Sequence, residues 1–227
     1  MTLNLYSIPP ACSFGAILLI ASVVFFKGRA VHTNKIFCLL CISLCGWLFG
    51  YTFMYNCSDP GDAIFWARVG FTSLLFIPIF AFHFVVSFCR ISLQTVLKII
   101  YFTIPFDIYF GWTSLIYKDI GTYFWGFYPV AGKGYFVFLI MFSAALMVAL
   151  FFLFRESRSA KKRGDLLRVQ QIRYVIFAYL FGLTGAVDYI IKFRIAIYPW
   201  GYISAFCFIA IIAYAIVRYR LMDIRLA

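Results

Sequence analysis

Three charged side chains lie inside stretches of the sequence that are otherwise apolar: Arg68, Asp107 and Asp188. A charge in the hydrocarbon of a bilayer costs at least ~2.5 to 3.5 kcal/mol, so such residues are usually paired and often functional. The opposite charges stand at similar depths, which favours an ion-paired cluster that joins three helices. We expect these residues to contribute to a ligand-binding site, the alternatives being a structural pair or side chains that reach the membrane surface.

The composition shows what kind of scaffold must hold these charges. The chain has 227 residues, of which 65% are hydrophobic and 12% are charged, and its mean hydropathy is +0.95. A soluble domain is about half apolar and a quarter charged, so a soluble enzyme is excluded. The 22% of aromatic residues also excludes a disordered or collagen-like chain. An integral membrane protein remains, whose net charge of +12 indicates orientation and not nucleic-acid binding.

Seven apolar stretches are long enough to cross a bilayer core about 30 Å thick as helices. They run over residues 7–26, 36–55, 63–89, 99–117, 135–154, 174–191 and 199–217. A β-barrel is disfavoured, because its strands would alternate apolar and polar residues. We therefore predict an all-α fold, an integral membrane bundle of seven transmembrane helices that forms one domain over residues 1–227, with no soluble domain.

The distribution of lysine and arginine predicts the orientation of this bundle. Most of the 20 basic residues fall in one set of connections and in the C-terminal segment, whereas the opposite set holds only Lys118, Lys133, Lys192 and Arg194. Because the basic side faces the cytoplasm, we expect the N-terminus outside and the C-terminus inside. No basic residue precedes Lys27, so the first span is expected to stay as a helix and not to be cleaved as a signal peptide.

Two connections are long enough to carry a function. The inner segment 155–173 is strongly basic; it is either a solvated loop, an extension of the sixth helix, or an interfacial helix attracted to anionic lipid. The outer segment 118–134 is rich in aromatic residues around Trp125 and is punctuated by glycines. It is expected to fold back over the helix ends, either as an aromatic anchor at the membrane surface or as a lid over a ligand cavity.

Metal binding and catalysis find little support in the residue types. His83 lies within an apolar helix and His32 in a loop, and Cys38, Cys41 and Cys45 share one helical face, where packing explains them. We therefore predict no catalytic residue, no metal and no cofactor. The last span contains no lysine, which excludes a retinal Schiff base, and the Asp-Arg-Tyr and Asn-Pro-x-x-Tyr motifs of animal G-protein-coupled receptors are absent.

The stretch from Ala213 to Ile224, AYAIVRYRLMDI, closely resembles the end of the seven-transmembrane sensor region at the N-terminus of many bacterial histidine kinases. Weaker similarities are Trp66-Ala67-Arg68, Phe76-Ile77-Pro78, Tyr128 to Gly132, and Asp188 followed by Tyr198-Pro199. The resemblance implies a sensory domain in the bacterial cytoplasmic membrane, in which the last helix passes a signal to a cytoplasmic PAS, GAF or kinase module. The signal-output residues would be Arg218, Tyr219, Arg220 and Asp223.

The chain differs from a complete histidine kinase, because it carries no phospho-acceptor histidine motif and no nucleotide-binding box. We expect the output module downstream or on a partner chain. The signal would be a small ligand, a peptide or a lipid that binds near Arg68, Asp107, Asp188 and Trp125. Membrane lipids are partners, nucleic acid is not, and a homodimer is left open. A small transporter or channel, or a structural subunit of a membrane complex, is the alternative.

Overall fold

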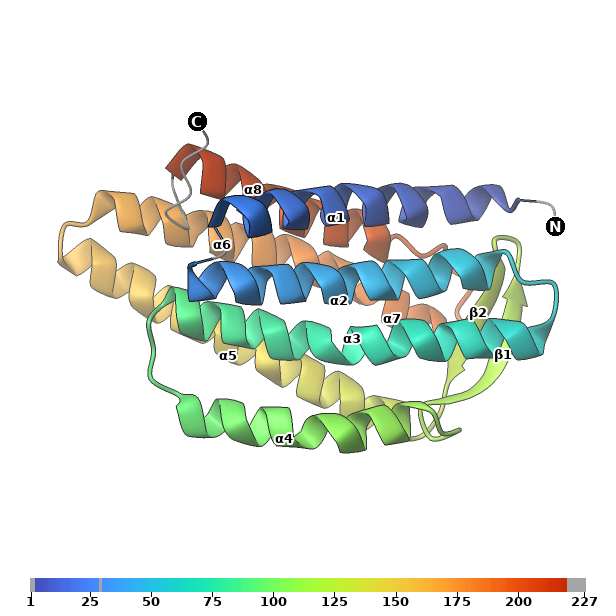
Figure 1. Cartoon of the computed structure of the whole chain (residues 1–227). Coiled ribbons are helices and arrows are strands. Elements are labelled where there is room, and N and C mark those ends of the chain that lie inside the picture. The colour runs from blue at the N-terminus through green and yellow to red at the C-terminus, as the bar shows by residue number, and fades with distance from the viewer. Residues whose placement is uncertain (1–2, 29, 220–227) are drawn as a thin grey trace.

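A computed structural model describes residues 3–28 and 30–219 (Figure 1). After a 3₁₀ turn, η1 (Leu5–Ser7), the first four helices are α1 (Ile8–Gly28), α2 (His32–Tyr55), α3 (Pro60–Phe88) and α4 (Gln94–Gly111). Two strands follow, β1 (Tyr117–Tyr123) and β2 (Gly126–Ala131). The remaining helical elements are α5 (Tyr135–Lys162), α6 (Leu166–Leu183), the 3₁₀ turn η2 (Thr184–Ala186), α7 (Val187–Ile191) and α8 (Gly201–Tyr219).

The long helices pack side by side as a bundle (Figure 1). Helix α3 lies between α2 and α5, α4 lies against α3 at the edge, and α8 packs between α6 and α1. The α2–α3 contact is very close where two glycines meet, because a Cβ on Gly50 would lie only 2.6 Å from the backbone nitrogen of Gly70. Small residues at such a crossing allow the two backbones to approach closely, and the resulting van der Waals contacts stabilise the helix pair.

Among the described residues, five helical segments are long and apolar enough to cross a membrane: Leu5–Gly28, His32–Tyr55, Pro60–Phe88, Tyr135–Lys162 and Leu166–Ile191. The apolar helix Gly201–Ile216 is shorter. A helical membrane bundle is therefore confirmed, and a helix lies in each of the seven stretches that the sequence predicts. The sixth stretch is not one regular helix, because η2 interrupts it between α6 and α7.

The outer segment corrects the purely helical prediction. The fourth helix ends at Gly111 and not at Tyr117, which is instead the first residue of β1. Strands β1 and β2 pair antiparallel as a hairpin, with Tyr123 opposite Gly126. Gly126 has a positive φ of 123°, a conformation that glycine adopts without the strain a side chain would add. The prediction that this segment turns back on itself is thus correct, but its backbone hydrogen bonds are satisfied as strands.

The inner segment is also more regular than predicted. Residues 155–162 continue α5, and α6 begins at Leu166 after a tight turn in which Gly164 has a φ of 74°. The side chain of Asp165 accepts a hydrogen bond from the backbone nitrogen of Arg168 at 2.9 Å and so caps the start of α6. Both helices therefore extend beyond the apolar bundle, and no separate interfacial helix forms there.

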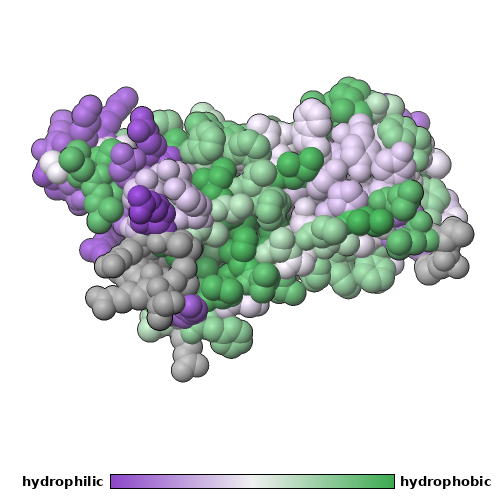
Figure 2. Space-filling view, turned by 90° about the horizontal axis from the view of Figure 1, so that it is seen from above, coloured by the Kyte–Doolittle hydropathy of each residue, from purple (hydrophilic) through white to green (hydrophobic). Residues whose placement is uncertain are grey.

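The two ends of the bundle differ in character. The hairpin and the described N-terminal residues lie at one end, which we call the hairpin end (Figure 1). The α1–α2, α3–α4 and α5–α6 connections and the end of α8 lie at the other, which we call the basic end. Figure 2 shows hydrophilic residues gathered over the far ends of α5 and α6, next to a broad hydrophobic band. The band is the surface expected of a protein that faces lipid.

Candidate functional site

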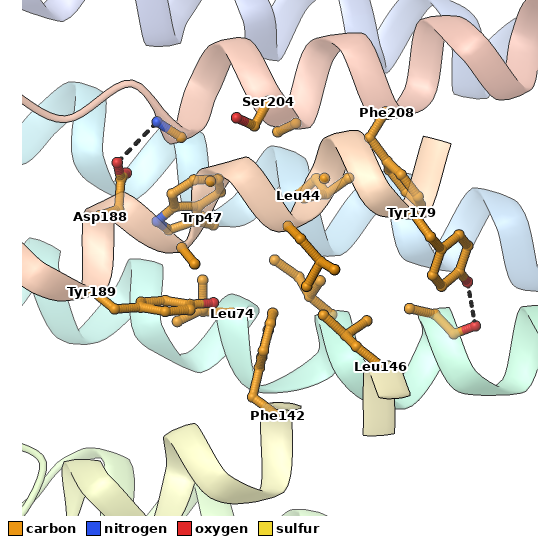
Figure 3. Close-up of a pocket in the computed structure, with 18 of the residues that line it drawn as sticks. Leu44, Trp47, Leu74, Phe142, Leu146, Tyr179, Asp188, Tyr189, Ser204 and Phe208 are labelled. Carbon is orange, nitrogen blue, oxygen red and sulfur yellow. Dashed lines mark hydrogen bonds between the residues drawn. The ribbon is translucent and has the colours of Figure 1, made fainter. Parts of the chain in front are cut away.

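Asp188 holds the first turn of α8. This residue of α7 is only 3% exposed, and its Oδ1 accepts a hydrogen bond from the backbone nitrogen of Gly201 at 2.9 Å (Figure 3). The backbone nitrogen of Trp200 donates to the same oxygen at 3.1 Å. A carboxylate at a helix N-terminus satisfies amides that have no partner within the helix and complements the helix dipole. Only glycine fits beside it, because a Cβ on Gly201 would lie 2.5 Å from Asp188 Oδ2.

A cavity of about 90 Å³ opens next to this cap, enclosed by α2, α3, α5, α6 and α8. Its walls are mostly apolar and include Leu44, Leu74, Phe142, Leu146 and Phe208 (Figure 3). This volume is several times the ~10–15 Å³ that one water-sized group requires. The cavity can therefore accept a small molecule or one end of a larger one.

Three polar side chains lie together at one end of the cavity, whereas the hydroxyl of Tyr179 at the other end donates to the backbone oxygen of Ala81 at 2.6 Å. Asp188, Ser204 and Trp47 all line the first of these ends, and the indole nitrogen of Trp47 is buried and has no hydrogen-bond partner in the described structure. Ser204 Oγ lies 2.8 Å from Thr184 Oγ1, on the turn that interrupts the sixth span. Apolar walls with a few convergent polar groups are typical of small-molecule sites, where the polar groups fix the orientation of the ligand.

Lys192 lies one helical turn after Asp188 and is almost fully buried, at 1% exposure. Its Nζ donates a hydrogen bond to the backbone oxygen of Asp188 at 3.2 Å. Four tyrosine rings surround the ammonium group with centroids at 5.0 to 5.7 Å, and they belong to Tyr51, Tyr128, Tyr135 and Tyr189. Cation–π attraction stabilises a desolvated ammonium at such distances. The site thus contains a buried cation beside a buried carboxylate, although no salt bridge joins their charged atoms.

The hairpin is fastened to the same turn. The hydroxyl of Tyr128 donates to the backbone oxygen of Asp188 at 3.2 Å, and the backbone nitrogen of Ala131 donates to the backbone oxygen of Lys192 at 2.8 Å. Burial raises the pKa of Tyr128 well above its usual value, so its hydroxyl stays protonated and remains a donor. Displacement of the hairpin would therefore act directly on the α7–α8 connection.

The predicted ion pairing of Arg68 is wrong. Arg68 lies half-buried on α3, where its Nε is buried without a hydrogen-bond partner, and it forms no salt bridge with Asp107 or Asp188. Asp107 is half-buried on α4 and accepts a hydrogen bond from Thr103 Oγ1 at 2.9 Å. Neither residue lines the cavity, so of the three intramembrane charges only Asp188 does. The charges were predicted at similar depth, but depth alone does not bring side chains on different helices together.

Trp125 is also absent from the cavity wall. It is completely buried at the tip of the hairpin, where its ring stacks on Tyr123 with centroids 4.6 Å apart. Its backbone oxygen accepts a hydrogen bond from Asn4 Nδ2 at 2.9 Å, and the same amide group donates to Tyr55 at 2.8 Å. Trp125 therefore fixes the hairpin to the N-terminal residues and to the end of α2.

Sequence reasoning missed Lys192 and Trp47. Lys192 was placed in an outer loop as a surface cation, yet its spacing of four residues from Asp188 is the signal that both share one helical face. Trp47 carried no comparable signal, because it stands in a run of apolar residues and its importance depends on what α8 places opposite it.

At the basic end, the predicted output residues are partly described. Tyr219 is held against α6, since its backbone oxygen accepts a hydrogen bond from Gln171 Nε2 at 3.0 Å and its ring lies 5.0 Å from that of Tyr174. Arg218 is exposed. Arg220 and Asp223 lie outside the described residues. The last turn of α8 is thus coupled to α6, the helix that leads to Asp188.

The family model of the N-terminal seven-transmembrane region of histidine kinases matches residues 10–225 of the chain. The chain belongs to this family. The match extends from α1 to beyond α8 and confirms the resemblance that the C-terminal stretch indicates. No curated protein and no solved structure matches the chain. As a histidine kinase seven-transmembrane region, it is a membrane sensory domain associated with a histidine kinase.

Proposed function

We propose that this histidine kinase seven-transmembrane region detects a signal at its hairpin end or within the membrane and relays it through α8 to a cytoplasmic kinase module. The observation that carries the proposal is the double position of Asp188, which lines the cavity and also caps the first turn of α8. A ligand that donates a hydrogen bond to this carboxylate changes the anchoring of the output helix.

The ligand has a small apolar body and a polar end. Its apolar part packs against the cavity walls, while a hydroxyl group donates to Asp188 and accepts from the indole of Trp47. Trp125 contributes indirectly, by holding the hairpin above the α7–α8 connection. Arg68 on α3 and Asp107 on α4 both lie in the half of the helix nearer the hairpin end. Neither lines the cavity, so neither contacts a ligand bound there.

The relay requires two packings of α8. A ligand shifts an equilibrium only by its difference in affinity for the two states, and the capped and uncapped states of α8 differ in the availability of the Asp188 carboxylate. Because α8 is held at one end by Asp188 and at the other by the contacts of Tyr219 with α6, a change at the cap is passed along one rigid helix. The output then includes Arg218, Tyr219, Arg220 and Asp223.

The orientation follows from the basic end, which carries the connections rich in lysine and arginine and faces the cytoplasm. The N-terminus is then outside, the C-terminus is inside, and α4 and α8 cross the bacterial cytoplasmic membrane together with the five longer spans. This region performs no catalysis; the kinase or PAS-type module that it controls lies downstream or on a partner chain.

Autophosphorylation of the kinase, measured in vesicles together with this region, tests the proposal. Asp188→Ala should change the basal kinase rate several-fold, whereas Asp62→Ala, an exposed residue in the first turn of α3, should leave it unchanged. A kinase rate that is the same in both variants, at equal amounts of folded protein, would contradict the relay through α8. A C-terminal reporter that reads out on the outer side would contradict the orientation.

A further inference from the structure

The exposed face at the C-terminal end of α5 combines aromatic and basic side chains. A surface groove there is lined by Phe151, Phe154, Arg155, Arg158, Ser159 and Lys162. The three basic residues and the two phenylalanines are exposed. Residues three and four apart lie on the same side of a helix, so the spacing from Phe151 to Lys162 places all of them along one stripe.

The depth of this stripe matches that of lipid headgroups. The apolar part of α5, from Tyr135 to Phe154, spans about 30 Å at a rise of ~1.5 Å per residue, which equals the thickness of the hydrocarbon core. Arg155 and Arg158 then stand within about 6 Å of the hydrocarbon boundary and Lys162 about 12 Å beyond it. The headgroup layer is only about 5 to 8 Å thick on each side, so both guanidinium groups lie at the level of the phosphates.

The charge of these three residues is not neutralised by neighbouring carboxylates. Glu156 is bound by Arg163 through a salt bridge of 2.8 Å, and Asp165 caps α6. The phenylalanines, in contrast, face the level of the acyl chains. The groove therefore presents cations to the headgroup layer and aromatic rings to the hydrocarbon directly beneath it.

We propose that this groove is a binding site for an anionic phospholipid. The lipid phosphate is bound by Arg155 and Arg158, Lys162 attracts the outer part of the headgroup, and one acyl chain packs on Phe151 and Phe154. Guanidinium groups suit phosphate oxygens because they donate two parallel hydrogen bonds. The inference is independent of the sensing function and of the orientation, since it depends only on the length of the apolar part of α5.

Binding of fluorescent phosphatidylglycerol to the full chain in phosphatidylcholine nanodiscs tests the proposal. The triad variant Arg155→Gln/Arg158→Gln/Lys162→Gln is compared with a control that loses three exposed lysines outside the groove, Lys118→Gln/Lys133→Gln/Lys161→Gln. Because each cation near the surface contributes about a fivefold gain in lipid affinity, the triad variant should bind at least about tenfold more weakly. The control should lose much less affinity than the triad variant, although the two variants have the same net charge, because its lysines lie outside the groove.

Two further measurements distinguish binding of a whole lipid from binding of a free phosphate group. Phe151→Ala should weaken lipid binding, and millimolar inorganic phosphate should not displace the lipid, because free phosphate lacks the acyl chain. Equal losses in the triad and control variants, no loss in the triad variant, or displacement by phosphate would each overturn the proposal. If the triad variant does not fold, the single substitution Arg158→Gln against Lys161→Gln makes the same comparison, with an expected loss of about fivefold.

Discussion

Replacement of Asp188 by alanine removes the acceptor of two hydrogen bonds at the start of α8. Loss of an N-terminal cap costs about 0.5 to 2 kcal/mol, and a charged, buried acceptor belongs at the upper end of this range. The substitution also leaves the buried ammonium of Lys192 without a neighbouring negative charge. We therefore expect a loss of at least about 2 kcal/mol, which corresponds to about a 30-fold increase in local opening.

Hydrogen exchange of the purified chain in nanodiscs measures this opening. The amides of Trp200 and Gly201 should exchange about 30-fold faster in Asp188→Ala. Asp188→Asn keeps an amide oxygen that can accept both bonds, so it should lose much less protection. Asp107→Ala, which removes a single hydrogen bond from Thr103, is the control for loss of an intramembrane carboxylate. Unchanged exchange at Trp200 and Gly201 in Asp188→Ala would show that the cap does not hold α8.

Three other substitutions test neighbouring parts of the site. Gly201→Ala should lower the thermal unfolding temperature, because the new Cβ would collide with Asp188. The control Gly15→Ala on α1, where a Cβ would meet nothing within 4 Å, should leave that temperature unchanged. Equal effects of the two substitutions would disprove the close fit at Gly201. Lys192→Met should destabilise the chain in the same assay by leaving the Asp188 carboxylate without its buried cation, and an unchanged midpoint would show that the charges do not compensate. Burial and nearby acidic residues raise the pKa of Cys57, so its labelling by maleimide should be slower than that of a free thiol at neutral pH and should increase towards alkaline pH; rapid labelling at neutral pH would contradict this.

The sequence was sufficient for the helices because the length of an apolar run is a direct requirement of the bilayer. It was less informative for β1, where Lys118, Asp119 and Gly121 interrupt any alternation of apolar and polar residues. Pairing with β2 stabilises that strand, and such pairing depends on residues that are close only after the chain has folded back.

The sequence likewise predicts some residues of the candidate site and not others. Asp188 stood out because a charge in an apolar run is costly, and its spacing from Lys192 was readable as one helical face. The tyrosines around Lys192 come from α2, from β2, from α5 and from α7, so no local pattern joins them. The expected pair between Arg68 and an aspartate failed for the same reason, because the rotation of each helix about its axis is set by packing against its neighbours.

The contact between α1 and α8 makes the first and last of the described helices neighbours. During synthesis, α1 leaves the ribosome long before α8 exists, so the side of α1 that later meets α8 first borders lipid. The bundle closes on this side of α1 only when α8 has been inserted and has replaced those lipids with protein. Closure of this bundle therefore coincides with the emergence of α8, the helix on which the proposed relay depends.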